Sequence, residues 1–390
     1  MDSGPRTHWA AAVLPVSPAP LVSVTLPARN AARTIARAVA SVRAQTLADW
    51  ELLVVDDGST DGTREILRTL ARAEPRLKLI ERAHAGVAAA ANAAAAAARG
   101  EFVARMDADD ESHPERLAAQ VAFLRAPEHR AVGVVGSLVA FGGDAVASAG
   151  YALHVDWTNT LTTPEAIALN RFVESPLVNP SALWRRELVA RHGGWRDGDF
   201  PEDYELWLRW LDAGVRIAKV PRVLLTWHDA PTRLTRTDAR YAPEKFFAMK
   251  AEWITREAAR LGVGRGRLTP PSAGATFGGP AGSATPPYDE RKIFVWGAGR
   301  HTRKRAAHLT ALGVAIAGYV DVDAKKTGRG LGGTGLPVIG AEDLPPPGNT
   351  ADGGGVFVLS YVTTRGARDY NRAALLARGY VEGRDFLLCG

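Results

Sequence analysis

The sequence contains a single cysteine, Cys389, next to its C-terminus. One thiol excludes an intramolecular disulfide, a zinc site built from several cysteines and a cysteine nucleophile set in a motif. Chains without disulfides are typical of reducing compartments. We therefore expect a cytoplasmic protein.

Residues 1–20 lack the features of a targeting or membrane segment. They contain no charged region followed by an uninterrupted apolar stretch, which a secretory signal requires. Prolines at positions 5, 15, 18 and 20 would break a membrane-spanning helix. These residues are predicted to be a disordered leader, and no transmembrane segment is expected.

Charge of one sign is not gathered into blocks. Lys and Arg number 48 against 42 Asp and Glu, which gives a net charge of +6, and the arginines are scattered along the chain. Scattered charge is typical of a solvated surface and does not indicate nucleic-acid binding. A basic protein still favours anionic partners such as nucleotide diphosphates or lipid phosphates. Peripheral contact with a membrane therefore stays open.

Length and composition indicate a folded protein of two domains. With 390 residues, 46% of them hydrophobic, the chain exceeds what one core usually organises. Residues 261–290 are rich in Gly, Pro, Ala and Ser, which bury too little apolar surface to offset the entropy of ordering. They are predicted to link a domain at 21–260 to a domain at 291–390.

Strand and helix patterns alternate in the first domain. Short apolar runs are followed by stretches with helical apolar spacing. This alternation predicts an α/β fold with a mainly parallel central sheet and helices on both faces. After residue 130 it loosens into an α+β half that we expect to bind the acceptor. The predicted order is strand 21–26, helix 32–45, strand 50–55, helix 60–73, strand 77–81, helix 87–98 and strand 102–106.

Three acids directly follow the strand at 102–106, in the run Asp107-Ala108-Asp109-Asp110. Acids at the carboxyl end of a strand in an open α/β sheet lie in the ligand crevice. At this spacing, they can hold a hard divalent cation and, through it, a diphosphate. The alternative is an acidic turn that caps the helix beginning near Pro114.

Two further pairs of acids stand at element ends. Asp56 and Asp57 follow the strand at 50–55 and precede Gly58. A carboxylate there can accept hydrogen bonds from a nucleobase or ribose, although an Asp-rich turn is equally common. Glu202 and Asp203 begin a predicted helix at 201–213, where they suit the helix dipole and could also act as a base toward an acceptor hydroxyl.

In this order and at this spacing, the motifs resemble those of the inverting family 2 glycosyltransferases, which have the GT-A fold. The combination is far more specific than any one motif, and the resemblance covers residues 20–255. The segments that carry it are Val22-Ser23-Val24-Thr25-Leu26-Pro27-Ala28-Arg29-Asn30, Asp56-Asp57-Gly58-Ser59, Gly86-Val87-Ala88-Ala89-Ala90-Ala91-Asn92, Asp107-Ala108-Asp109-Asp110, Pro114-Glu115-Arg116-Leu117, Gly193-Gly194-Trp195 and Glu202-Asp203.

The resemblance implies a metal-dependent transfer of a hexose from a UDP-, GDP- or dTDP-sugar to an unidentified hydroxyl acceptor, in the synthesis of a cell-surface polysaccharide or glycoconjugate. It implies that Asp107 and Asp109 hold Mn²⁺ or Mg²⁺, with His228 near the metal or the diphosphate. Asp203 would be the general base, supported by Glu202. The implied nucleotide-binding residues are Pro27, Arg29, Asn30, Asp56, Asp57 and Asp107.

At several positions, the roles implied by the resemblance have an alternative. Ala91 stands where many relatives have an arginine, and Arg29 stands where an aromatic residue is frequent, so the resemblance leaves the phosphate and base contacts open. His228 also fits a surface loop with scattered arginines. Trp195 is expected to stack on a sugar or the acceptor, with a core position as the alternative.

The second domain begins with a Rossmann-like pattern. A strand at 291–296 is followed by Gly297-Ala298-Gly299, a helix at 301–312 and a strand that ends at Asp321. In such a fingerprint, the helix start binds phosphate and the acid binds a ribose, which leaves NAD(P) or another nucleotide open as a ligand. Thr302 occupies the third glycine position, and no hydride-transfer pair is visible. We therefore favour a binding, regulatory or assembly role over an oxidoreductase.

Two alternatives remain for the whole chain. One is a nucleotide-sugar-binding or regulatory protein whose catalysis has lapsed, against which the acids at 107, 109 and 203 argue. The other is a bifunctional protein whose C-terminal domain is an NAD(P)-dependent sugar oxidoreductase.

Overall fold

The computed structural model describes residues 19–263 apart from residue 231, and residues 291–390 apart from 329, 332, 333, 348–354 and 364. Except for a few residues at their edges, the predicted leader and linker lie outside the described residues. Within these ranges, no helix has both the length and the apolar character needed to cross a bilayer.

A mixed sheet of eight strands forms the centre of the first part of the chain. Its strands are β1 (Val22–Ala28), β2 (Trp50–Asp57), β3 (Leu77–Arg82), β4 (Phe102–Arg105), β5 (Glu111–Ser112), β6 (Val132–Phe141), β7 (Leu183–Arg185) and β8 (Arg216–Trp227). They lie in the order β3-β2-β1-β4-β7-β6-β8-β5. Strands β1 to β4 pair in parallel, as do β6 and β8, while β7 and β5 run antiparallel to their neighbours. The predicted α/β class with a mainly parallel sheet is confirmed.

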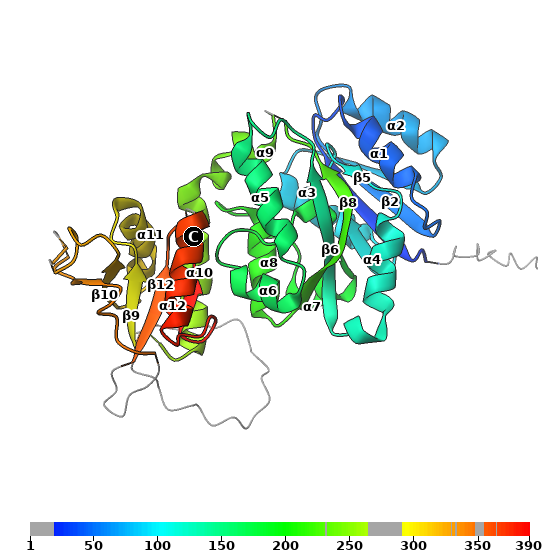
Figure 1. Ribbon diagram of the computed structural model, residues 1–390. Coiled ribbons are helices and arrows are strands. Elements are labelled where there is room, and N and C mark those ends of the chain that lie inside the picture. Colours follow the sequence, from blue (N-terminus) through cyan, green and yellow to red (C-terminus); the bar gives the residue numbers. More distant parts are fainter. Residues whose placement is uncertain are drawn as a thin grey trace, which may run out of the picture.

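Helices cover both faces of this sheet (Figure 1). The central strands β1 and β2 are buried along their whole length, including the polar Ser23, Thr25 and Glu51 that interrupt their apolar residues. The helices of this part are α1 (Ile35–Arg43), α2 (Thr63–Ala73), α3 (Val87–Ala97), α4 (Arg116–Arg125), η1 (Pro127–His129), α5 (Ala149–Thr160), α6 (Pro164–Asn170), η2 (Asn179–Ser181), α7 (Glu187–His192), α8 (Glu202–Asp212), α9 (Leu234–Thr237), η3 (Ala239–Tyr241) and α10 (Pro243–Arg260).

The alanine-rich helix α3 packs directly on β1 and β2. Ala88, Ala90, Ala91 and Ala94 are buried, and their small side chains let the helix axis approach the sheet closely. The prediction of a closely packed helix in this alanine-rich segment is therefore confirmed.

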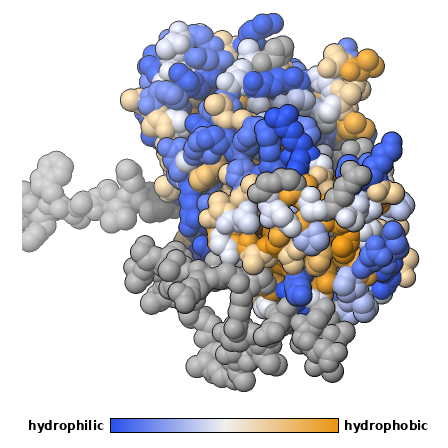
Figure 2. All heavy atoms as spheres, turned by 90° about the vertical axis from the view of Figure 1, so that its left-hand side faces the viewer, coloured by the Kyte–Doolittle hydropathy of each residue, from blue (hydrophilic) through white to orange (hydrophobic). Residues whose placement is uncertain are grey.

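A second, parallel sheet lies in the C-terminal part, in the order β11-β10-β9-β12-β13. The predicted strand, turn, helix and strand after residue 290 are present as β9, α11 and β10. Figure 2 views this side of the molecule and shows apolar residues exposed among charged ones. Its elements are β9 (Lys292–Trp296), α11 (Arg300–Ala311), β10 (Ile316–Asp321), β11 (Val338–Gly340), β12 (Val356–Ser360), α12 (Arg365–Ala377) and β13 (Phe386–Leu388).

Helix α10 lies between the two sheets (Figure 1) and joins their cores. One hydrophobic cluster combines Tyr204 of α8, Met249 of α10 and Ile293 of β9. The buried Lys250 of α10 donates hydrogen bonds to three carbonyl oxygens, at 3.1 Å to Phe172, 3.2 Å to Val173 and 3.0 Å to Cys389. The C-terminal part therefore shares a hydrophobic cluster with α8, the helix that carries Glu202 and Asp203, and α10 contacts both.

Candidate active site

The loops that follow β1 and β2 are hydrogen-bonded to each other at the carboxyl edge of the sheet. Asn30 adopts a left-handed backbone with φ of 50°. Its side-chain oxygen accepts from the backbone N–H of Thr60 at 2.9 Å, and its own N–H donates to the Ser59 hydroxyl at 3.0 Å. Pro27 is buried in β1, whereas Arg29 is exposed. Arg29 and Asn30 are both exposed and therefore open to a ligand.

The two aspartates at the end of β2 are buried and bonded within the protein. Asp56 accepts from Arg64 Nε at 2.8 Å. Asp57 accepts from the backbone N–H groups of Ala85 at 3.0 Å and Gly86 at 2.9 Å, and lies 2.7 Å from His84 Nδ1. In this structure Asp57 fixes the loop that leads into α3.

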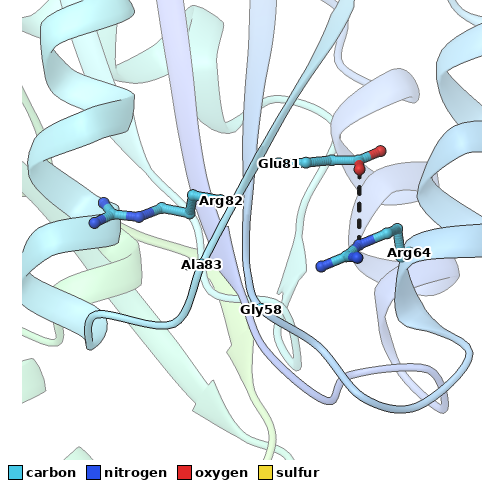
Figure 3. A pocket seen from close by; sticks show the side chains of 5 residues that line it. All are labelled: Gly58, Arg64, Glu81, Arg82 and Ala83. Atoms are coloured by element: carbon cyan, nitrogen blue, oxygen red, sulfur yellow. Dashed lines mark ion pairs between the residues drawn. The ribbon is translucent and has the colours of Figure 1, made fainter.

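A hollow of about 410 Å³ opens beside these aspartates and is lined by Gly58, Arg64, Glu81, Arg82 and Ala83 (Figure 3). Arg64 and Glu81 face each other as an ion pair at 3.8 Å, and Arg82 points to the opposite side of β3. Gly58 has φ of +71°, and a Cβ there would lie 2.7 Å from the backbone nitrogen of His84. A glycine turn flanked by guanidinium groups suits an anionic ligand.

The acids after β4 each face a different partner. Asp107, with 23% of its side chain exposed, accepts from Arg105 Nε at 2.9 Å. Asp109, 32% exposed, lies 3.7 Å from Arg233 Nη1. The buried Asp110 accepts from the backbone N–H of His228 at 2.9 Å. Because Asp110 bonds to this distant loop and the N-cap of α4 makes no side-chain hydrogen bond, the helix-capping alternative is wrong.

Burial raises the pKa of Asp109, and the Arg233 charge opposes this. Burial, followed by the neighbouring Asp109, raises the pKa of Asp110 well above its usual range. One oxygen of Asp110 also has no hydrogen-bond partner among the described residues. Crowded carboxylates of this kind favour a bound cation or a proton.

The residues present fit a divalent cation only in part. Across the described ranges, no three side chains of the metal-ligating types converge on one point. Asp107 and Asp109 nevertheless offer partly exposed carboxylate oxygens, which are the donors that Mg²⁺ and Mn²⁺ prefer. An ion that takes its other ligands from a diphosphate and water needs no more than one or two protein carboxylates.

His228 lies beside the acids, as predicted, but its ring faces Glu111. The ring Nε2 is 3.4 Å from Glu111 Oε2. Arg233 donates to the carbonyl oxygen of His228 and stacks over Trp227, with its guanidinium carbon 4.3 Å from the ring centroid. The structure therefore brings His228 to the acid motif together with Arg233.

Glu202 and Asp203 occupy the first turn of α8. Glu202 is buried and accepts from the Tyr241 hydroxyl at 2.7 Å. Burial raises the pKa of Glu202, and the hydrogen bond from Tyr241 opposes the rise. Burial, followed by the charge of Glu202, raises the pKa of Asp203 to about 7. A carboxylate that titrates near neutral pH is suited to general-base chemistry.

Sequence reasoning missed two residues of this site. Arg105 is a charge inside an otherwise apolar strand, and its position two residues before Asp107 was a signal that could have been read. Tyr241 comes from the short helix η3, and nothing in its sequence context indicates a contact with Glu202.

The expectation that Trp195 stacks on a ligand is wrong. Its side chain is 4% exposed and packs edge-on against Trp184, with ring centroids 5.8 Å apart. Asn92 of α3 accepts from the backbone N–H of Trp195 at 2.9 Å and donates to its carbonyl oxygen at 2.7 Å. These two bonds pull the glycine turn inward, so the indole enters the core.

Replacing Gly194 with alanine is expected to destabilise this turn. A Cβ at position 194 would collide with the Asn92 side-chain oxygen, which is already committed to Trp195. Overpacking of this kind costs about 1–3 kcal/mol, so the thermal midpoint should fall by a few degrees. Gly150→Ala is the control, because a Cβ there meets no atom within 4 Å. Equal midpoints of the two variants in thermal unfolding would contradict the expectation.

The predicted C-terminal residues come together at the carboxyl ends of β9 and β10. Gly297 has φ of +102°, and Gly299 precedes α11. Asp321 is buried and accepts from the backbone N–H of Ala298 at 2.8 Å and from Lys326 Nζ at 3.1 Å. In this structure Asp321 therefore fixes the glycine turn. A hollow of about 340 Å³ beside it is lined by Ala298, Gly299, Arg300, Arg303, Lys326, Gly330, Leu331 and Val338.

Residues 23–192 match the family model for glycosyl transferase family 2. The chain is 34% identical over 203 residues to the Bacillus subtilis protein named "Putative glycosyltransferase EpsE", an alignment that covers 50% of this chain and 69% of that protein. It is 40% identical over 98 residues to a chondroitin synthase of Pasteurella multocida, covering 25% of this chain and 10% of the synthase.

Among solved structures, the Pyrobaculum calidifontis mannosyltransferase PcManGT in complex with GDP-Man and Mn²⁺ is 26% identical, with a TM-score of 0.43 over 62% of this chain and 64% of that chain. The chain thus spans about a tenth of the chondroitin synthase and less than two thirds of the mannosyltransferase. Its similarity to EpsE extends over more than two thirds of that protein, and together with the family match this shows that the chain belongs to glycosyltransferase family 2.

Proposed function

We propose that the chain transfers a sugar from a nucleoside diphosphate sugar to a hydroxyl acceptor and inverts the anomeric configuration. One observation carries the proposal. Asp107, which follows β4, is among the charges that raise the pKa of Asp203 at the start of α8, after burial and Glu202. We therefore propose that a donor-binding acid and a candidate base share one site at the carboxyl edge of the sheet.

The donor side of the site is formed by the loops after β1, β2 and β4. We propose that these loops, which carry Pro27, Arg29, Asn30, Asp56 and Asp57, bind the base and ribose, with the exposed Arg29 and Asn30 as direct contacts and the hollow in Figure 3 beside Asp56 and Asp57. Asp109, with Asp107, would hold Mn²⁺ or Mg²⁺, and His228 lies within reach of the same acids. When bound, the ion would neutralise charge on the departing diphosphate.

The acceptor side is formed by the start of α8. As the acceptor oxygen bonds to the anomeric carbon, the bond from that carbon to the diphosphate oxygen breaks, and the hydroxyl proton passes to Asp203. Glu202, held by Tyr241, fixes the turn that presents Asp203. With the base and the leaving group on opposite faces of the sugar, a single displacement inverts the anomeric carbon.

The class of acceptor follows from the relatives. One of them is a chondroitin synthase, so we propose that the acceptor is the end of a growing polysaccharide or glycoconjugate. We also propose the domain division at 21–260 and 291–390, with the second domain serving a binding or assembly role. No observation in the described residues favours an oxidoreductase.

The test is release of nucleoside diphosphate from a panel of UDP-glucose, UDP-N-acetylglucosamine, GDP-mannose and dTDP-glucose. We expect at least one donor to be turned over with Mn²⁺ or Mg²⁺, and chelation by EDTA to abolish the signal. A protein that binds one of these donors, measured by thermal shift, but turns none over under any metal condition would support the lapsed alternative.

A further inference from the structure

A second hollow, of about 340 Å³, lies in the C-terminal part beside the turn that joins β9 to α11. Its wall carries three cationic side chains: Arg300 and Arg303 at the start of α11, and Lys326 in the segment after β10. None of the residues that line it within the described part of the chain is acidic. A hollow whose walls carry charge of one sign concentrates ions of the opposite sign. It is therefore suited to an anion.

The charge of Lys326 is already balanced, whereas the charges of the two arginines are not. Lys326 Nζ lies 3.1 Å from Asp321 Oδ2 and 3.6 Å from Asp323 Oδ2. Within the ranges that the structure describes, the side chains of Arg300 and Arg303 make no hydrogen bond or ion pair, and Arg303 Nε is buried without an acceptor. A guanidinium nitrogen removed from water needs an acceptor. The hollow places an anion beside the group that lacks one.

The first residues of α11 are arranged against the dipole of their own helix. They include Arg300, His301 and Arg303 but no acid, and the N-cap residue Gly299 makes no side-chain hydrogen bond. The N–H groups at a helix start carry partial positive charge, so cations destabilise this end and an anion stabilises it. A Cβ added at Gly299 would meet no atom within 4 Å, so the backbone here faces open space. One anion could therefore balance both the arginines and the helix start.

Asp321, the residue that a dinucleotide site would use to bind a ribose, is already occupied. Its carboxylate accepts from the backbone N–H groups of Ala298 at 2.8 Å and Asp323 at 3.0 Å, in addition to Lys326. The volume of the hollow also lies near the lower end of the range for small-molecule sites, about 300–1,000 Å³. Both observations favour a small anionic ligand over a dinucleotide.

We propose that this hollow binds a small phosphate monoester, and that Arg300 and Arg303 bind its phosphate group. Planar guanidinium groups form paired hydrogen bonds with phosphate oxygens, and the first N–H groups of α11 supply further donors. The rest of the molecule, a sugar or a nucleoside, lies toward Leu331 and Val338. This site goes beyond the proposed sugar transfer and does not depend on it, because its residues belong to α11 and the second sheet.

The test measures binding of inorganic phosphate, glucose 1-phosphate and UMP to the full chain by isothermal titration calorimetry at constant ionic strength. EDTA is present, so that no metal ion can join a phosphate to the acids after β4. We expect binding, with one of the two esters tighter than inorganic phosphate. The tighter ester identifies the ligand as a sugar phosphate or a nucleotide. In Arg300→Gln/Arg303→Gln, Kd should rise at least about tenfold, because charge-assisted hydrogen bonds to the phosphate are lost.

Lys292→Gln/Lys304→Gln is the matched control. Both lysines are exposed, one in β9 and one in α11, and neither lines the hollow. This variant loses the same charge as the arginine variant and should keep the wild-type Kd. Without ligand, the arginine variant should unfold at the wild-type thermal midpoint or slightly above it, because it loses cations from a helix start. The bound ester should raise the midpoint of wild type but not that of the arginine variant.

Four results would overturn the proposal. Wild type could bind none of the three probes, or the arginine variant could keep the wild-type Kd, which would place the binding elsewhere. An equal rise of Kd in the lysine control would indicate unspecific attraction by charge. Tighter binding of NAD than of either ester, lost in the arginine variant, would make the site a dinucleotide site. Should the double arginine variant not fold, the exposed Arg300 is replaced alone: a raised Kd in Arg300→Gln supports the site, and an unchanged Kd overturns it.

Discussion

Replacing Asp203 with asparagine is expected to lower kcat about 10²–10⁴-fold, the range that a positioned general base contributes. The amide keeps the shape of the side chain but cannot accept the acceptor proton. Donor binding should change little, because the donor acids come from β4 rather than α8. Steady-state kinetics with the active donor would show the loss in kcat with an almost unchanged donor KM.

The pH profile gives this prediction a second measure. The base must be ionised to act, and burial with the neighbouring Glu202 raises the pKa of Asp203 to about 7. Activity of the wild type should therefore be half-maximal near pH 7 and level off about one pH unit above it. The residual activity of Asp203→Asn should show no such limb.

The same substitution should stabilise the protein at alkaline pH. Asp203 has an ordinary pKa of 3.8 in the unfolded chain and about 7 in the folded one. As pH rises between these values, the unfolded chain releases its proton first, so the free energy of unfolding falls. Above about pH 7 the penalty is complete, and Asp203→Asn removes it.

We therefore expect the thermal midpoint of Asp203→Asn to exceed that of wild type by several degrees at pH 8 and to match it near pH 4. Asp49→Asn, in the exposed turn before β2, is the control and should alter neither activity nor midpoint. An active variant, or a midpoint below wild type at pH 8, would contradict the assignment of Asp203.

Much of the fold could be read from the sequence because burial leaves a direct pattern. Strands β1 and β2 are short, mainly apolar and rich in β-branched residues, so they stand out, and the acids that end β2 and follow β4 mark the carboxyl edge. Parallel pairing brings such strand ends together. The acids of the site could therefore be predicted, although no one motif was specific alone.

The partners of those acids could not be predicted because long-range packing sets them. The Asp57 carboxylate accepts hydrogen bonds from the loop before α3, and the Glu202 carboxylate accepts one from Tyr241 of η3. Trp195 looked like a ligand contact because it follows two glycines, yet Asn92 draws it into the core. Periodicity shows which face of an element is buried but not which distant side chain meets it.

The C-terminal part shares a hydrophobic core with the first part of the chain, although the sequence predicted only a linker between them. Tyr204, next to the proposed base, belongs to the cluster that includes β9, and its hydroxyl donates to the carbonyl oxygen of Arg171 at 2.6 Å. The helix that begins with Glu202 and Asp203 thus packs on α10, and the same hydrophobic cluster continues into the second sheet. We therefore expect a change in this packing to alter the orientation of Asp203.

Replacing Asp109 with asparagine is expected to lower metal-dependent turnover by about 10²-fold or more, because a metal ion supplies several kcal/mol of charge stabilisation in such reactions. Asp109 is the most exposed of Asp107, Asp109 and Asp110, and Arg233 lies 3.7 Å from its carboxylate. The concentration of Mn²⁺ needed for half-maximal activity should rise by at least tenfold. Titration of Mn²⁺ by electron paramagnetic resonance, with UDP or GDP present, would measure binding independently of turnover.

The neighbouring acids provide the internal comparison. Asp107→Asn should weaken Mn²⁺ less than Asp109→Asn, because Arg105 already shares the charge of Asp107. Asp110→Asn should act mainly on stability, since Asp110 is fully buried and bonded to the backbone of His228. Equal Mn²⁺ affinity in wild type and Asp109→Asn, with Asp49→Asn as the surface control, would remove Asp109 from the metal site. In that case Asp107 would be the remaining candidate metal ligand among these acids.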